Sequence, residues 1–306
     1  MAVVEVDGLR KRYGDTVAVD GVSFAVEDGE IFGILGPNGA GKTTIVECVE
    51  GVRRPDAGRI SVLGLDPRRD RARLRRVLGA QLQSGMLPEK LRVGEALALY
   101  RSFYREGADP GRLLDELGLA GKRDTAFEDL SGGQAQRLAI ALALVGRPRI
   151  AVLDELTTGL DPQARRGTWD LIEQVRDTGV TVLLVTHLME EAERLCDRVA
   201  IVDRGRLAAL DTPGGLVAAL DAPRRVRFRT AGPFDPAVLA GLAEVTEVRT
   251  RRGETVVTGT GDLLDAVGTA LLRHGVVATE TRLERATLED AFLALTGRPY
   301  GDGEAA

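Results

Sequence analysis

The segment Gly36-Pro37-Asn38-Gly39-Ala40-Gly41-Lys42-Thr43-Thr44 has the spacing G-x-x-x-x-G-K-S/T. It directly follows the apolar run Ile31–Leu35 and precedes a helix-like pattern, which is the context that a phosphate-binding loop requires. Glycines let backbone N–H groups surround phosphate oxygens, and the following helix adds the positive end of its dipole. Lys42 can reach the outer phosphates of a nucleotide, and the Thr43 hydroxyl can bind Mg²⁺. A glycine-rich turn with a chance lysine is the alternative, and the strand–loop–helix context favours nucleotide binding.

Apolar runs of strand length recur along the first two thirds of the chain. Like Ile31–Leu35, the runs Ile150–Leu153 and Thr181–Val185 are each followed by a polar or glycine-rich turn and then a helix-like pattern. Strand–helix alternation predicts an α/β fold with a mostly parallel sheet. Between residues 84 and 146 strand signals vanish and helical periodicity takes over, which predicts a helical insertion in this core.

The pattern changes again after Pro213-Gly214-Gly215. From Arg225 the sequence predicts a strand, a helix, two strands, a helix, a strand and a last helix near Leu288–Leu295. A capping signal, Thr287-Leu-Glu-Asp290, precedes that last helix. We therefore expect a first domain at residues 1–220 and a small α+β domain of ferredoxin-like order at residues 221–306.

Composition excludes several classes of protein. The 306 residues are 44% hydrophobic and 28% charged, as in an ordinary soluble globular protein, and the net charge of -5 argues against a nucleic-acid partner. The only cysteines, Cys48 and Cys196, form no C-x-x-C pair, so neither a disulfide scaffold nor a zinc cluster is expected. The longest apolar runs, such as Leu138–Val145, are shorter than the roughly 18 residues of a membrane span.

Two acids end the apolar strand that begins at Ile150. In proteins with a phosphate-binding loop, an acid at the position of Asp154 holds Mg²⁺, and the neighbouring Glu155 is placed to polarise the water that attacks the γ-phosphate. Two acids alone are more often a solvated strand end. Together with the phosphate loop, they predict the second half of an ATPase site.

A second anion-binding feature follows the helical insertion. Leu130-Ser131-Gly132-Gly133-Gln134, followed by Arg137, places a hydroxyl and two glycines at a predicted helix N-terminus. At this point the sequence resembles the ATP-binding subunit of ABC transporters, over about residues 3 to 215 and with every motif in the family's order. The resemblance implies a P-loop NTPase core with an antiparallel β subdomain and the helical insertion.

The resemblance also implies roles for single residues. Tyr13 stacks on adenine, Gln83 contacts Mg²⁺ or water, Asp161 couples two subunits, and His187 senses the γ-phosphate. Structural roles are the alternatives for Tyr13 and His187. Gln81 lies near Gln83, but the spacing from Leu78-Gly79 favours Gln83.

In that family two subunits close head to tail around two ATP molecules. The phosphate loop of one subunit then faces Ser131 and Gly133 of the other, so that a homodimer or a heterodimer is expected, with ATP and Mg²⁺ as cofactors. A separate membrane permease is implied, and a peripheral position on the cytoplasmic face of the membrane. Leu156 departs from the family, which usually has proline after the second acid.

Two stretches point to one branch of the family. Residues 288–297 and the segment Leu153–Pro162 resemble the drug-export branch typified by daunorubicin-resistance ATPases. We therefore expect an exporter ATPase. The ATPase of an importer and a non-transport ABC ATPase are the alternatives. Transport specificity would lie in the permease, so the sequence does not identify the transported substrate.

Overall fold

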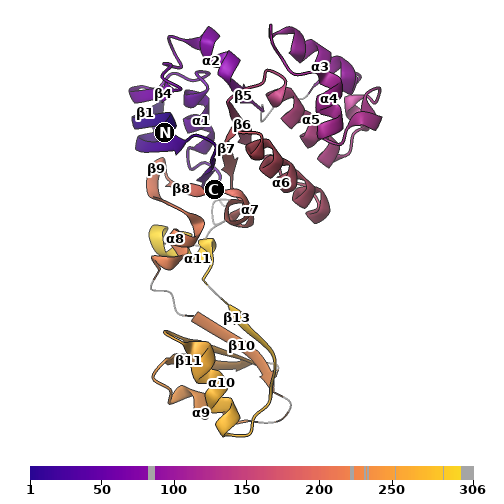
Figure 1. Cartoon of the computed structure of the whole chain (residues 1–306). Helices are drawn as coiled ribbons and strands as arrows, with labels where there is room; N and C mark the ends of the chain where they lie inside the picture. Colours follow the sequence, from indigo (N-terminus) through magenta and orange to yellow (C-terminus); the bar gives the residue numbers. More distant parts are fainter. Residues whose placement is uncertain are drawn as a thin grey trace. The chain divides into compact units, whose positions relative to one another are not determined.

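The computed structural model describes residues 1–81, 87–220, 224–230, 232, 234–251, 253–284 and 286–297. Contacts between residues divide the chain into two units, at residues 1–214 and 215–299 (Figure 1). Each unit has its own sheets and its own apolar core, so each is described by itself. No helix in these described ranges is long and apolar enough to cross a membrane.

The central sheet of the first unit has the strand order β5-β6-β7-β3-β8-β9 among the described residues. These strands are β3 (Ile31–Leu35), β5 (Leu78–Ala80), β6 (Ile150–Asp154), β7 (Thr181–Thr186), β8 (Arg198–Asp203) and β9 (Arg206–Asp211). All neighbouring pairs are parallel except β8 and β9. Every residue of β3, β6 and β7 is buried, which explains their continuous apolar runs. The predicted parallel α/β core is confirmed.

A second, antiparallel sheet packs on the core through α1 (Lys42–Val49). Its order is β2-β1-β4, with bounds β1 (Ala2–Tyr13), β2 (Thr16–Glu27) and β4 (Ala57–Val62). Helix α1 contacts all three strands, and its buried side chains include Ile45 and Val46. Phe24 of β2 stacks on Phe32 of β3 with ring centroids 5.2 Å apart, so one apolar cluster joins both sheets.

The described residues between β5 and β6 form helices and no strand, as the change in periodicity predicts. These elements are α3 (Val93–Ser102), α4 (Pro110–Glu116), η1 (Ala120–Lys122), η2 (Phe127–Asp129) and α5 (Gly132–Leu144). Figure 1 shows α3, α4 and α5 grouped beside α6 (Pro162–Asp177), which α5 contacts directly. Two further helices are described in this unit, α2 (Arg71–Val77) and α7 (Met189–Leu195). Helix α8 (Pro213–Ala218) contains the boundary between the units.

The second unit has the element order predicted from the sequence. Its sheet order is β11-β12-β10-β13, all antiparallel, with bounds β10 (Arg224–Thr230), β11 (Val245–Arg251), β12 (Glu254–Gly259) and β13 (Ala278–Glu284). Helices α9 (Ala237–Ala240) and α10 (Leu263–Arg273) bury Leu239 and Val267 against Phe228. The last helix, α11 (Leu288–Thr296), begins with the predicted capping box of Thr287 and Asp290.

Candidate active site

Three neighbouring parallel strands end at the same height. They place the predicted acids and the loop together at the carboxyl-terminal ends of the strands. Leu35 at the end of β3 is level with Thr186 of β7, and Asp154 of β6 is level with Val185 of β7. The segments that follow these strands are the loop 36–41, Glu155 and His187. The sheet register therefore brings together groups that lie about 150 residues apart in sequence.

Close packing explains two glycines of the loop. A Cβ at Gly36 would lie 2.2 Å from the carbonyl oxygen of Val202, so no side chain fits there. Gly41 has φ +103° and a Cβ there would lie 2.3 Å from the carbonyl oxygen of Ala18. Gly41 is also the N-cap of α1 and supplies no side-chain bond, which leaves the first N–H groups of α1 to an incoming anion.

Lys42 lies within this loop and is only 4% exposed. Its Nζ donates to the carbonyl oxygens of Gly36 at 2.8 Å and Pro37 at 3.1 Å, and lies 3.8 Å from Glu155 Oε1. Burial lowers the pKa of Lys42, while the charges of Glu155 and Asp154 act in the opposite direction. A cavity of about 400 Å³ opens here, lined by Ala18, Asn38, Gly39, Gly41, Lys42, Thr43, Thr44 and Glu155.

Asp154 is buried, and one of its carboxylate oxygens is suited to act as a metal ligand. The Thr43 hydroxyl donates to its Oδ2 at 3.4 Å, and its backbone N–H donates to Gln81 Oε1 at 3.1 Å. Its Oδ1 is buried and has no hydrogen-bond partner in the part of the chain that the structure describes. Burial, with a smaller contribution from the charge of Glu155, raises the pKa of Asp154 to about 6. An unpartnered buried carboxylate oxygen beside a hydroxyl is a donor set that Mg²⁺ favours.

Glu155 and His187 meet beside Lys42. His187 Nδ1 lies 3.3 Å from Glu155 Oε1. Glu155 has φ +51°, in the left-handed region that non-glycine residues rarely adopt, and its N–H donates to the carbonyl oxygen of Val185 at 2.9 Å. Strained backbone of this kind is retained where the surrounding contacts determine it, often at functional sites. The carboxylate is thereby directed to the same cavity as Lys42.

Tyr13, at the end of β1, lies at the rim of the site. Its hydroxyl is 3.5 Å from the Thr44 hydroxyl, and the Arg53 guanidinium lies 5.3 Å from the centroid of its ring. The residue is 40% exposed, which leaves ring surface available for stacking.

The segment 131–134 is well formed, but none of its residues lines the cavity at Lys42. Ser131 caps α5 and forms a capping box with Gln134: Ser131 N donates to Gln134 Oε1 at 3.1 Å, and Gln134 N donates to Ser131 Oγ at 3.4 Å. Asp161 caps α6, its Oδ1 accepting from the N–H groups of Gln163 and Ala164 at 2.9 Å each. One chain therefore does not bring these residues to its own phosphate loop.

The structure adds residues that sequence reasoning missed, while Gln83 lies outside the described residues. Gln81, set aside in favour of Gln83, contacts the backbone of Asp154. Glu50, just after α1, has its pKa raised to about 7 by burial, with the charges of Asp154 and Glu47 contributing. Glu191 of α7 is fully buried. A sequence signal existed for Glu191, because it occupies the apolar face that Leu195 continues one turn later.

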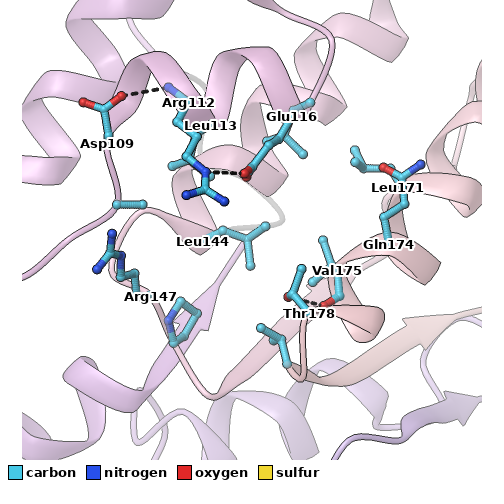
Figure 2. Close-up of a pocket in the computed structure, with 14 residues that line it drawn as sticks. Asp109, Arg112, Leu113, Glu116, Leu144, Arg147, Leu171, Gln174, Val175 and Thr178 are labelled. Atoms are coloured by element: carbon cyan, nitrogen blue, oxygen red, sulfur yellow. Dashed lines mark hydrogen bonds and ion pairs between the residues drawn. The ribbon is translucent and has the colours of Figure 1, made fainter.

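A larger cavity, of about 800 Å³, lies between α4 and α6 (Figure 2). Its apolar lining includes Leu113, Leu144 and Val175, and at its rim Arg112 donates to Glu116 at 2.6 Å. Pro148 and Val180, which also line it, precede β6 and β7, so it opens at the amino-terminal ends of those strands. None of the predicted site residues lines it, and it is distinct from the candidate active site.

Comparison with known proteins gives consistent similarities. Residues 19–158 match the family model described as ABC transporter. The chain is 40% identical to the "Daunorubicin resistance ATP-binding protein DrrA3" of Streptomyces coeruleorubidus over 302 residues, covering 96% of both chains. It is also 40% identical to the "Nod factor export ATP-binding protein I" of Burkholderia thailandensis, covering 99% of both.

Solved structures of similar fold cover about two thirds of the chain. An ATP-binding subunit of an ABC transporter has a TM-score of 0.64 and 28% identity, covering 71% of this chain and 92% of its own. A dimeric bacterial ABC transporter cassette has a TM-score of 0.62 and 26% identity, covering 68% of this chain and 98% of its own.

We expect Lys42→Ala to weaken ATP binding about 10- to 100-fold, because it removes a buried, charge-assisted donor to phosphate. Isothermal titration of the purified full chain with Mg-ATP measures the affinity. Lys122→Ala, which removes a lysine outside the cavity, is the matched control and should bind as the wild type does. An unchanged affinity for Lys42→Ala would remove this residue from the site.

We expect Glu50→Gln to stabilise the nucleotide-free chain at pH 8 and not at pH 4. The pKa of Glu50 is about 7 in the folded chain against 4.5 ordinarily, so the folded state binds more protons in this window and stability falls as pH rises from 4.5 to 7. Removing the charge should raise the free energy of unfolding by roughly 2 to 3 kcal/mol above pH 7. Urea unfolding at both pH values measures this difference. An equal gain at both values would contradict the electrostatic cause.

Proposed function

Because this chain belongs to the ABC transporter family, as an ATP-binding subunit that hydrolyses ATP, we propose that it powers a membrane exporter. The relatives at 40% identity are named for daunorubicin resistance and Nod factor export. These similarities extend over 96% to 99% of the chain, so they include the second unit. The observation that carries the proposal is this full-length similarity together with the site geometry: Lys42 and Glu155 line one cavity, and Asp154 accepts a hydrogen bond from Thr43, which also lines it.

In the proposed nucleotide site the loop 36–44 surrounds the phosphates of ATP. Lys42 would exchange its backbone carbonyl partners for phosphate oxygens, which are stronger acceptors. Thr43 and Asp154 would hold Mg²⁺, with Gln83 as a further ligand, and the ion supplies neutralising charge to the outer phosphates. Tyr13 would stack on the adenine.

Glu155 is the proposed general base. Its carboxylate, 3.8 Å from the Lys42 ammonium, would accept the proton of the water that attacks the γ-phosphorus. His187, 3.3 Å from the same carboxylate oxygen, would orient Glu155 and donate to a γ-phosphate oxygen. Both side chains follow strand ends fixed by the sheet register, so the backbone positions of these two residues are set before the nucleotide binds.

We propose that the second half of each site comes from a partner subunit. Ser131, Gly132, Gly133 and Gln134 present a helix N-terminus, and this segment is not part of the cavity at Lys42. A head-to-tail dimer would place it against the γ-phosphate held by the other subunit, with Asp161 near the interface. The similarity to a dimeric cassette supports this arrangement, and both a homodimer and a heterodimer are compatible with it.

The transmembrane path would be a separate permease, with this subunit peripheral on the cytoplasmic face. For the second unit we propose a ferredoxin-like accessory domain at residues 221–306, following a nucleotide-binding domain at residues 1–220. Its support is the element order β10-α9-β11-β12-α10-β13 and the antiparallel sheet order β11-β12-β10-β13.

We expect Glu155→Gln to slow ATP hydrolysis roughly 10²- to 10⁴-fold, the usual range for loss of a general base, with ATP affinity retained. Phosphate release by the purified chain measures turnover. Glu190→Gln, which changes an exposed carboxylate outside the cavity, is the matched control. Turnover near the wild-type rate in Glu155→Gln would exclude Glu155 as the base.

The export role is tested by what accompanies the trapped ATPase. Purification of Glu155→Gln from detergent-solubilised membranes with Mg-ATP should recover a multi-span membrane protein that lacks an ATPase domain of its own. Lys42→Ala, which should not close around ATP, is the comparison for recovery of a second ATPase subunit. A substrate-binding protein in the complex would favour an importer. Ribosomal or DNA-bound proteins without any membrane partner would overturn the transport assignment.

A further inference from the structure

One buried carboxylate outside the nucleotide cavity joins three parts of the first unit. Glu191 of α7 is fully buried, and its Oε1 accepts hydrogen bonds from the Thr157 hydroxyl at 2.7 Å and from Trp169 Nε1 at 3.0 Å. Its Oε2 is buried without a hydrogen-bond partner among the residues that the structure describes. Burying a carboxylate in this way is costly, so its presence calls for a physical reason.

The partners of Glu191 show which segments it connects. Thr157 lies in the segment 155–161, which begins at the proposed base and ends at Asp161, the N-cap of α6. Helix α7 starts two residues after His187. A single carboxylate oxygen therefore ties the segment that follows Glu155 to the helix that follows His187, while Trp169 fixes the carboxylate to α6.

The segment after Glu155 contains the fully buried side chain of Leu156, but the hydrogen bonds within it are long. Leu156 occupies the position where a proline would fix φ, and Glu155 itself has φ +51°. The turn bonds inside the segment are long, at 3.4 Å from Thr158 N to the Glu155 oxygen and 3.3 Å from Leu160 N to the Thr157 oxygen. The 2.7 Å bond from Thr157 to Glu191 is the shortest one described for this segment.

We propose that Glu191 is a positioning residue for ATP hydrolysis. It acts through Thr157, holding the backbone that carries Glu155 so that the carboxylate stays beside His187 and Lys42. This inference rests on the proposed role of Glu155 as the base. Glu191 itself does not line the nucleotide cavity, so its loss should affect turnover and not ATP affinity.

The chain offers a matched pair of substitutions, because Thr157 and Trp169 donate to the same oxygen. Thr157→Val removes the hydroxyl and keeps the side-chain shape, whereas Trp169→Phe removes the other donor and keeps an aromatic ring. We expect Thr157→Val to lower kcat about 10- to 100-fold, as misplacement of a catalytic group does, with the KM for ATP within about twofold of wild type. Trp169→Phe should lower the Tm at least as much and leave kcat within about threefold.

Two conservative variants complete the test. Thr157→Ser keeps the hydroxyl donor and Glu191→Gln keeps an acceptor oxygen. The kcat of each variant should therefore stay within about threefold of the wild-type value. Wild-type kcat in Thr157→Val, or equal losses of kcat in Thr157→Val and Trp169→Phe, would overturn the positioning role. Glu155→Gln in the same assay separates the two proposals. If Glu155→Gln hydrolyses ATP at the wild-type rate, the assignment of Glu155 as the base is wrong. If Glu155→Gln is slow and Thr157→Val has the wild-type rate, only the positioning role of Glu191 is wrong.

Discussion

The candidate active site depends on the register of three adjacent parallel strands, β6, β7 and β3. Leu35 and Thr186 end their strands at one height, and Asp154 lies one residue below. Because side chains alternate between the faces of a sheet, a slip of one residue would turn Asp154 to the opposite face and misalign Glu155 with Lys42. Burial of both faces of these strands makes such a slip costly. The apolar core is therefore what sets the geometry of the charged groups above it.

Charge repulsion and backbone strain are concentrated at this edge of the sheet. Asp154 and Glu50 are both held in surroundings that raise their pKa values, to about 6 and about 7, chiefly through burial. Lys42 is buried beside Glu155, which adopts a left-handed backbone conformation. Each of these features opposes folding of the chain without its ligands. Binding of ATP would offset these costs, so the folded chain loses stability at the positions that are arranged to receive the nucleotide.

Local motifs made much of this site predictable from the sequence. The phosphate loop, the two acids after β6 and the cap at Thr287 each depend on neighbouring residues, and the structure has each in the predicted context. The order of helices and strands in the second unit could also be predicted, because each type of element has its own periodicity of apolar residues.

Non-local packing accounts for what the sequence could not supply. Gln81 reaches Asp154 only because β5 pairs with β6, and Glu50 is affected by Asp154 across more than 100 residues of chain. Glu191 is buried by segments that lie far from it in sequence. Ser131 and Asp161 were recognised as motif residues, but their local roles in one chain are helix caps. Their expected contacts with nucleotide depend on a second subunit.

The indole of Trp169 belongs to the only tryptophan of the chain, and its N–H donates to Glu191. Emission from this indole comes from one site only, two hydrogen bonds away from the segment that carries Glu155. The fluorescence emission of a buried indole beside a carboxylate depends on the polarity and the geometry of that single contact. The fluorescence of Trp169 therefore reports on the contact between Glu191 and the segment that carries Glu155, without any added label.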